Sequence, residues 1–412
     1  MAKQTTTAWL IVAGLWIAMG LLFGSVQTTA GMFYRAVAGS FHLSRGMVSL
    51  LSSMTAPGLC VGMVLSGWLM QRVDAKRVML LGAVLVGLGF VCASRAHSFA
   101  QLLASCLLSG FGSGLGAYVP VSFIIGNWFG KRSGLAMGVA MTGAAFGGSA
   151  MVMLVGWVIA KAGWRWGYVA LGLPVFLIAV PLIALIRSRP NDREVAARHE
   201  PAAELTGLEL GPALRSREFW LVFLALFTFG WETHSIVGHL PPYLSGIGYG
   251  TAEVSTALSA ALALGSVGKI GLGWLADYID SRLVTMASFV TGGFGMVLLI
   301  GSASRALLIA GVLVMGLSWT APLALVPVVT MKSLGLKNYG AIFGVAAIAT
   351  ALGSGTGPVV LGWVYDLTGS YRDPLLINAA LMAVTGLAIC GCRPLAQTLV
   401  AVAEAMPLAS QG

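Results

Sequence analysis

Long apolar segments, separated by short polar breaks, run through the whole chain. Each segment has about 20 residues or more, which is the length with which an α-helix crosses a bilayer. The segments show no period-two alternation, and lipid requires backbone polar groups to be bonded internally, so they predict helices rather than barrel strands. The twelve helices are expected near 8–30, 46–69, 77–95, 98–126, 133–160, 164–187, 218–244, 253–276, 283–302, 305–330, 339–365 and 372–392.

One break is much longer than the others, and it divides the pattern into two halves of six helices each. This break, 188–217, is rich in Arg, Glu and Pro and predicts a cytoplasmic linker with at most a short surface helix. We therefore expect a six-helix bundle at 1–187, the linker, a second six-helix bundle at 218–392 and a cytoplasmic tail at 393–412.

Composition and charge agree with a membrane protein. Of the 412 residues, 58% are hydrophobic and only 9% are charged, whereas soluble domains carry about 25% charged residues. The net charge of +10 does not indicate a nucleic-acid partner, because the basic residues lie in the loops. With the N-terminus inside, 16 Lys and Arg fall on the cytoplasmic side and seven on the outer side. This imbalance predicts that both termini are cytoplasmic, and we expect a multi-pass protein of a bacterial-type inner membrane.

The two halves repeat each other at an offset of 206 residues. The matching stretches are Gly67-Trp68-Leu69 with Gly273-Trp274-Leu275, Asp74 with Asp280, Gly138-Val139-Ala140 with Gly344-Val345-Ala346, and Gly156-Trp157-Val158 with Gly362-Trp363-Val364. A six-helix half repeated in one orientation implies a pseudo-two-fold axis along the membrane normal. This arrangement is typical of transporters whose substrate site lies between the halves near the membrane midplane.

Two loops of this repeat resemble a sequence motif of a known protein family. The stretch Gly273-Trp-Leu-Ala-Asp277-Tyr-Ile-Asp-Ser-Arg282 and its weaker twin, Gly67-Trp-Leu-Met-Gln-Arg72, resemble the loop motif of the major facilitator superfamily. The segment Asn127-Trp-Phe-Gly-Lys131-Arg132 resembles the opening of the fifth helix in that family. The resemblance implies the major facilitator fold and alternating access by a monomer. It also implies a conformational latch that consists of Asp277, Arg282, Arg72, Lys131 and Arg132.

Three further stretches resemble the monocarboxylate and oxalate–formate transporter branches of that family. They are Gly163-Trp-Arg-Trp-Gly-Tyr168, His239-Leu-Pro-Pro-Tyr243 and Gly362-Trp-Val-Tyr-Asp366-Leu-Thr-Gly-Ser-Tyr371. The resemblance implies a small organic anion as substrate and no cofactor. The sequence shows no nucleotide-binding loop and no His, Cys and Asp cluster with metal-ligand spacing. We therefore expect neither an enzyme nor a metal site.

A lysine, Lys269, interrupts the apolar helix expected at 253–276. A cation at this depth costs on the order of 3 kcal/mol and usually faces a cavity or a partner, so Lys269 is the candidate for binding an anionic substrate. The alternative is a lysine that only packs in an ion pair. Similar transporters place a substrate-binding arginine eight residues before the loop aspartate, and Lys269 stands eight residues before Asp277. Similar dicarboxylate carriers add a lysine in helix 11, and its absence from 339–365 favours a monocarboxylate.

Glu232 and His239 are the candidates for proton coupling. They stand seven residues apart in one expected helix, which places them on nearly the same face, whereas His234 points roughly the opposite way. His239 is also a candidate hydrogen-bond donor to the substrate. Two alternatives stay open, namely a structural histidine at position 239 and a Glu232 that only neutralises Lys269.

Three uncharged residues complete the candidate substrate cavity. Tyr118 stands among small residues in helix 4 and resembles a cavity tyrosine of the family, and Gln27 belongs to a polar break in helix 1. Trp319 in helix 10 is an amphipathic aromatic that can close over a substrate. For Tyr118 and Trp319 the alternative is packing between helices.

Together these features favour a secondary transporter in the lipid bilayer that moves a small monocarboxylate together with a proton. Two other transport functions stay open. One is anion antiport of the oxalate–formate type, and the other is drug or metabolite efflux, for which Glu232 would matter more than Lys269. A sensor with a transporter fold is not favoured, because the tail after Arg393 is short.

Overall fold

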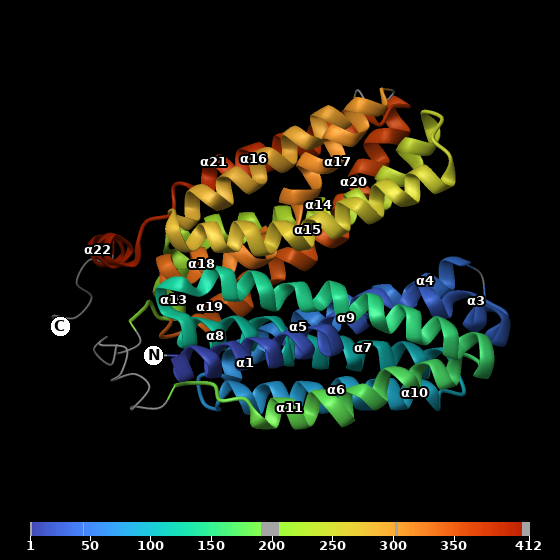
Figure 1. The fold of residues 1–412 in the computed structure, drawn as a ribbon, viewed down its shortest axis with the longest axis horizontal. Coiled ribbons are helices and arrows are strands. Elements are labelled where there is room, and N and C mark those ends of the chain that lie inside the picture. The colour runs from blue at the N-terminus through green and yellow to red at the C-terminus, as the bar shows by residue number, and fades with distance from the viewer. Residues whose placement is uncertain (1, 44, 191–205, 301–303, 406–412) are drawn as a thin grey trace. The chain divides into compact units, whose positions relative to one another are not determined.

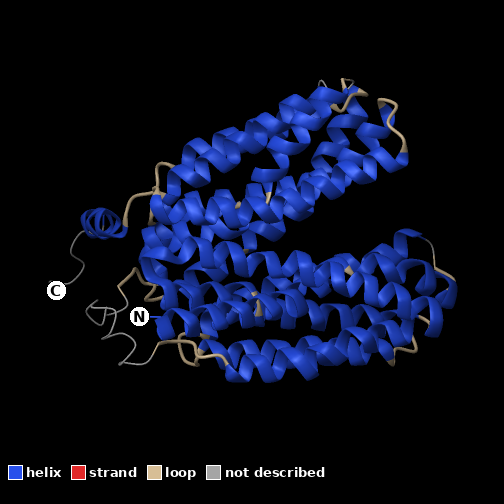
Figure 2. Cartoon of the chain, in the orientation of Figure 1, coloured by secondary structure: helices blue, strands red, loops and turns tan. Residues whose placement is uncertain are grey.

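The computed structural model describes residues 2–43, 45–190, 206–300 and 304–405, and nearly all of them are helical (Figure 2). Twelve helical segments in these ranges are long and apolar enough to cross a membrane, which confirms the expected number. Their bounds are Thr6–Thr28, Leu50–Leu69, Ala75–Ser94, Phe99–Phe129, Ser133–Ala162, Trp164–Leu185, Arg217–Val237, Thr256–Tyr278, Ser281–Ile300, Arg305–Leu334, Tyr339–Thr368 and Arg372–Ile389. The chain is therefore an all-α, multi-pass membrane protein.

The described residues separate into two compact units that largely follow the two sequence halves. Unit 1 contains 2–43, 45–130, 139–190 and 343–345, and unit 2 contains 131–138, 206–300, 304–342 and 346–405. Each unit thus includes one short helical piece from the other half of the sequence.

Unit 1 is built from the first spanning helices, several of which consist of shorter pieces (Figure 1). The pieces are α1 (Ala2–Ala18), the π-helix η1 (Met19–Gly24), α2 (Ser25–Thr28), α3 (Ala30–Phe41), α4 (Arg45–Ser53), α5 (Thr55–Leu69), α6 (Ala75–Ser94), α7 (Phe99–Gly116), α8 (Tyr118–Phe129), the 3₁₀ turn η2 (Gly130–Arg132), α9 (Ser133–Ala162), α10 (Trp164–Pro174), the π-helix η3 (Val175–Ala179) and α11 (Val180–Leu185). Helix α7 packs along both α5 and α6. The first spanning helix meets α9 at two glycines, Gly20 and Gly147, whose backbones touch.

Unit 2 is built from the remaining helices (Figure 1). They are α13 (Leu210–Arg215), α14 (Arg217–Gly246), α15 (Thr251–Tyr278), α16 (Ser281–Ile300), α17 (Arg305–Trp319), α18 (Pro322–Leu334), α19 (Tyr339–Ala346), α20 (Ile348–Thr368), α21 (Arg372–Ile389) and α22 (Leu395–Ala405). Helix α16 packs along both α17 and α21, and α14 packs along α20. Gly353 of α20, the repeat counterpart of Gly147, lies against the backbone of Phe227 in α14.

The 206-residue repeat recurs in close helix crossings of both units. In unit 1, Gly62 of α5 makes room for the carbonyl oxygen of Phe111 in α7, and in unit 2, Gly268 of α15 makes room for the carbonyl oxygen of Leu317 in α17. The two contacts stand at equivalent repeat positions, and a Cβ at either glycine would overlap the oxygen. Small residues allow this backbone approach between helices in lipid, so the crossing belongs to the architecture of each six-helix half.

The same equivalence extends to Lys269. In unit 1, Gly344 packs against the carbonyl group of Met63, and in unit 2, Gly138 packs against the carbonyl group of Lys269. Met63 and Lys269 therefore occupy equivalent positions, and the second half carries a cation where the first half carries a methionine.

Several spanning helices are interrupted along their length. The fourth breaks at Ala117 (φ −107°, ψ −93°) and the tenth at Thr320, and the second and eleventh have shorter interruptions. The first passes through η1 and ends at Thr29, and the sixth passes through η3. Irregular backbone at this depth is tolerated where it is buried in protein or lines a cavity. The apolar pattern predicted continuous helices at Ala117 and Thr320, although Pro120 and Pro322 stand near these two breaks.

The last part of the linker is bound to unit 2. Gly207 forms an antiparallel bridge with Gly335, and the Leu208 N–H donates to the Leu334 carbonyl at 3.0 Å. Gly335 has a φ of +84°, which favours glycine because a Cβ is strained there. Helix α13 follows this bridge directly, at the place where the sequence predicts a short helix in the linker. The linker residues 191–205 lie outside the described residues.

The glycine crossing of α15 yields a stability prediction. Replacing Gly268 with Ala should destabilise the fold by about 1–3 kcal/mol or more, because the added Cβ overlaps the Leu317 carbonyl oxygen. The matched control is Gly271→Ala in the same helix, where a Cβ meets no atom within 4 Å. This control should keep the parent melting temperature or exceed it, since alanine favours a helix by about 1 kcal/mol. Equal melting temperatures for the two variants in detergent would contradict the crossing.

Candidate functional site

Lys269 lies within α15, and its side chain is buried with only 5% of its surface exposed. The ion pairs between described residues do not include Lys269, and no described polar atom forms a hydrogen bond with its ammonium group. A buried cation without a partner is strongly unfavourable. Lys269 is therefore suited to bind an anion that is supplied from outside the fold.

Trp319 lies against the same face of α15. Its indole nitrogen is 3.1 Å from the place that a Cβ would take on Gly265, and Gly265 is one helical turn before Lys269 on that face. The Trp319 side chain is 0% exposed, and its Nε1–H has no hydrogen-bond acceptor among the described residues. The neighbouring Thr320 hydroxyl already donates to the Gly265 carbonyl at 2.9 Å. The face thus offers an unpaired cation and an unused N–H donor.

Glu232 is a buried acid of unit 2. It lies in α14 with 0% exposure, and neither carboxyl oxygen has a hydrogen-bond partner among the described residues. No ion pair joins it to Lys269 in the part of the chain that the structure describes. Ionisable groups of this kind inside a membrane usually mark an ion or proton pathway.

His239 lies two turns further along α14, and its ring contacts α20. Its Nε2 atom is 2.9 Å from the carbonyl oxygen of Pro358. Because a carbonyl only accepts, Nε2 carries the hydrogen, and the neutral ring keeps a lone pair on Nδ1. The Nδ1 atom is buried and has no partner among the described residues. His234 differs, because it is exposed and its Nδ1 lies 3.2 Å from the Gly230 carbonyl oxygen of its own helix.

The candidates from the first half, Gln27 and Tyr118, both lie beside helix breaks of unit 1. Tyr118 follows the break at Ala117, is 2% exposed, and packs edge-on to Phe343 with ring centroids 5.2 Å apart. Gln27 is exposed in α2 next to the break at Thr29. In unit 2, Trp319 likewise ends α17 at a break, so all three uncharged candidates share this backbone feature.

Asp277 binds the first turn of α9. Its Oδ1 accepts the Gly134 N–H at 2.7 Å and its Oδ2 accepts the Leu135 N–H at 2.9 Å. The first N–H groups of a helix lack intrahelical acceptors and carry partial positive charge, so a carboxylate is favoured there. The residues that sequence reasoning named in this segment were Lys131 and Arg132, and the backbone partners were missed because no side-chain identity signals them.

The other expected latch residues have different contacts. Arg282 forms an ion pair with Asp280, and its hydrogen bonds hold the pKa of the Asp280 carboxyl below its usual value. The Arg72 guanidinium lies over the Trp68 ring, 4.4 Å from its centroid. Arg132 is exposed, and the side chain of Lys131 lies outside the described residues.

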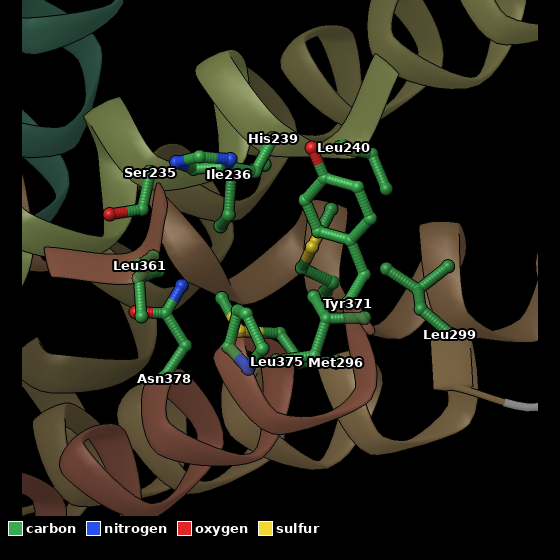
Figure 3. Close-up of a pocket in the computed structure, with 12 residues that line it drawn as sticks. Ser235, Ile236, His239, Leu240, Met296, Leu299, Leu361, Tyr371, Leu375 and Asn378 are labelled. Carbon is green, nitrogen blue, oxygen red and sulfur yellow. The ribbon is translucent and has the colours of Figure 1, made fainter. Parts of the chain in front are cut away.

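Two polar residues of the site were not singled out from the sequence. Ser235 is 1% exposed, and its hydroxyl has no partner among the described residues. Asn378 of α21 accepts a hydrogen bond from the Trp231 indole at 2.7 Å. Figure 3 shows both residues with His239 around a small cavity. For Ser235 the available signal was its place three residues after Glu232, whereas Asn378 gave no signal.

The described residues contain no group of three or more His, Cys, Asp or Glu that is able to hold a metal ion. What the site offers is one buried cation, one buried acid, a histidine with a free nitrogen, and hydrogen-bond donors at helix breaks. Groups of these kinds are chemically able to bind an anion and to exchange protons.

Curated relatives of this chain are transporters. Monocarboxylate transporter 13 of Rattus norvegicus is 29% identical over 289 residues, which cover 69% of this chain and 65% of that protein. The same transporter of Bos taurus is 28% identical, with 71% and 67% covered. A probable sulfoacetate transporter, SauU of Cupriavidus necator, is 25% identical over 86% of both chains. The chain thus matches slightly less than two thirds of the rat protein.

Solved structures of major facilitator transporters share the fold. The fucose:proton symporter FucP of E. coli superposes with a TM-score of 0.75 over 95% of this chain and 99% of that one, at 18% identity. The proton:xylose symporter XylE superposes with a TM-score of 0.74 at 12% identity, over 95% of this chain and 97% of the other.

The family assignment follows from a match over most of the sequence. The profile described as the Major Facilitator Superfamily matches residues 15–358. That range includes Lys269, Glu232 and His239. The chain therefore belongs to the major facilitator superfamily, and it is a transporter.

Proposed function

We propose that this protein is a secondary active transporter that moves a small monocarboxylate together with a proton by alternating access. The observation that carries the proposal is Lys269, a buried ammonium group without an ion pair among the described residues. A carboxylate from the substrate satisfies this cation when it binds. Because no described residue forms an ion pair with Lys269, the substrate is its partner only while it is bound, and binding stays reversible.

The charge of the site favours one carboxylate rather than two. The spanning segment Tyr339–Thr368 contains no Lys or Arg, so it offers no second cation. The names of the relatives, monocarboxylate transporter 13 and a probable sulfoacetate transporter, also support an organic anion. Lysine is a point charge without the fork of a guanidinium, so other donors must orient the carboxylate.

Trp319 is the best placed donor for that purpose. Its unused Nε1–H lies on the Lys269 face of α15, where a carboxylate can accept from the indole and the ammonium together. From unit 1 we assign Gln27 and Tyr118 to the wall of the substrate path, because both stand at breaks in spanning helices. The role proposed for His239 is proton exchange through its free Nδ1 atom.

Proton coupling is assigned to Glu232 and His239. Both are titratable, both carry buried atoms without partners, and both lie on α14. The transporter is expected to work as a monomer in an inner membrane with both termini in the cytoplasm, because Lys and Arg are more frequent in the loops that would then be cytoplasmic.

Removing the Lys269 charge should abolish specific substrate binding. We expect Lys269→Gln to weaken binding of small monocarboxylates about 30-fold or more, since loss of one partner of a buried charge pair costs about 2–5 kcal/mol. Thermal-shift titration of the purified protein measures this change. Lys269→Arg should retain binding, and so should Lys332→Gln, whose parent ammonium donates to the Ala276 carbonyl at 3.1 Å. Equal binding by Lys269→Gln and the parent protein would refute the site.

Proton coupling is measured in proteoliposomes. An inward proton gradient should accelerate uptake of the bound monocarboxylate, and the uptake should acidify the lumen. Uptake that needs no gradient and exchanges one anion for another would indicate the antiporter instead. Transport of neutral or cationic drugs that survives Lys269→Ala would indicate efflux.

Asp277 should act as a conformational latch through the N-terminus of α9. We expect Asp277→Asn to destabilise the latched state by about 0.5–2 kcal/mol, because the amide keeps only one oxygen acceptor for two N–H donors and loses the negative charge that a helix N-terminus favours. The matched control is Asp280→Asn, since asparagine keeps the cap on the Arg282 N–H. Melting temperature and transport rate should change in the first variant only; identical behaviour of both would exclude the latch.

A further inference from the structure

Three polar residues form a stripe along α14. Glu232, Ser235 and His239 are spaced by three and four residues, so at about 100° per residue they fall within a sector of about 60°. The buried atoms on this stripe are both carboxyl oxygens, the serine hydroxyl oxygen and the histidine Nδ1, and none of them has a hydrogen-bond partner among the described residues. Buried polar groups are normally bonded to protein or ordered water, so this series needs an explanation.

A small cavity lies along the stripe. Figure 3 shows Ser235 and His239 of α14 on one wall and Asn378 of α21 on the opposite wall. The remaining wall is mostly apolar, with side chains such as Met296 and Leu375. The cavity volume is about 10 Å³, which corresponds to one water molecule and excludes an organic acid. Its lining includes the polar side chains of Ser235, His239 and Asn378, and buried waters bond to polar groups of this kind.

Tyrosines cover the His239 end of the cavity. The Tyr371 ring centroid is 5.8 Å from that of His239, and Tyr365 stacks on Tyr371 at 4.2 Å. Burial raises the pKa of the Tyr371 hydroxyl, which therefore stays neutral near pH 7. The Tyr243 hydroxyl donates to the Leu299 carbonyl at 2.6 Å.

Charged residues of the neighbouring helices do not engage the stripe. Helices α15 and α18, which pack against α14, carry Lys269 and Lys332. Neither forms an ion pair with Glu232 in the described residues, and α17, α20 and α21 supply no ion pair or hydrogen bond to Glu232 or His239 from a charged side chain there. Proton exchange along the stripe therefore depends on its own members and on water.

Unit 1 contains the repeat counterpart of this cavity. Seven lining positions of the two cavities are equivalent at the 206-residue offset, among them Thr29 with Ser235 and Phe33 with His239. The counterpart of Glu232 is Val26, which lines the unit 1 cavity, whereas Glu232 lies next to Ser235 on the stripe but outside the lining of the unit 2 cavity. The hollow is thus a feature of each six-helix half, and only its chemistry differs.

The unit 1 cavity has no comparable series of unpaired groups. The Thr29 hydroxyl donates to the Ser25 carbonyl at 2.7 Å, and Phe33 stacks on Tyr168 with centroids 3.9 Å apart. In unit 2, valine is replaced by glutamate and phenylalanine by histidine. Unit 2 therefore carries two titratable groups at stripe positions where unit 1 carries apolar side chains.

We propose that Glu232, Ser235 and His239, with one water molecule in the cavity, form a proton relay inside unit 2. The inference rests on the proposed proton symport and assigns its route. The proton binds Nδ1 of His239, and the resulting imidazolium keeps its Nε2–H bond to the Pro358 carbonyl. The imidazolium gives the proton to the water, the water gives one to the Ser235 hydroxyl, and that hydroxyl gives its own to the Glu232 carboxylate. Only N–H and O–H bonds change, and the net product is a neutral carboxylic acid.

The unit 1 residues supply variants that suit the fold. Glu232→Val and His239→Phe restore the side chains of the equivalent cavity, and His239→Gln keeps a donor for the Pro358 carbonyl but does not titrate. We expect proton influx that accompanies substrate uptake to fall by at least about tenfold in each, while Glu232→Val retains Lys269-dependent binding of the monocarboxylate. The control Thr29→Ala removes the equivalent hydroxyl of unit 1 and should change neither. Proton influx at the parent level in Glu232→Val or His239→Gln overturns the relay.

The parent protein separates failure of the relay from failure of the proposed function. If the parent binds no monocarboxylate, or imports it without a proton, the proposed function fails. The existence of the relay is then tested without substrate, by infrared difference spectroscopy after a pH jump. The carboxyl C=O band that disappears in Glu232→Val reports Glu232, and its formation should slow by at least about tenfold in His239→Gln. An unchanged rate rules out the route through His239.

Discussion

Hydrocarbon offers no water to a polar group, and this constraint governs both the regular and the irregular parts of the structure. The spanning helices satisfy their backbone internally, as lipid requires. The exceptions are breaks in several helices and a few ionisable side chains of unit 2, among them Lys269 and Glu232. A buried polar group without a partner costs free energy, so these exceptions are the candidates for contact with substrate, water or a proton.

The two halves share their packing and differ in their chemistry. Glycine crossings recur at equivalent positions of both units, and so does a small cavity next to the first helix of each half. At three equivalent positions, however, unit 2 has Lys269, Glu232 and His239 where unit 1 has methionine, valine and phenylalanine. Pseudo-symmetry of the fold therefore coexists with a strong asymmetry of charge.

Much of this arrangement could be predicted from the sequence because it depends on local properties. Length and hydropathy are sufficient for the twelve spans, and a lysine among apolar residues is visible in any single helix. The helix breaks at Ala117 and Thr320 were not predictable, because the apolar pattern continues through both. The partners of Asp277 were missed for a related reason: they are the amides of Gly134 and Leu135, and every residue except proline has such an amide. To recognise the stripe that Ser235 completes, the cavity seen in the structure was needed in addition to the residue spacing seen in the sequence.

The paired glycine crossings also bear on how such a chain evolves. After a gene for six helices duplicates, steric exclusion at Gly62 and at Gly268 limits both copies to the same narrow choice of residue. The positions that face the cavities are free of that limit, so mutation there changes chemistry without disturbing the scaffold. Divergence between the copies is thereby channelled into a few side chains, and one copy can specialise while its twin preserves the ancestral apolar hollow. The differences between the two halves of one molecule then indicate which substitutions changed its chemistry.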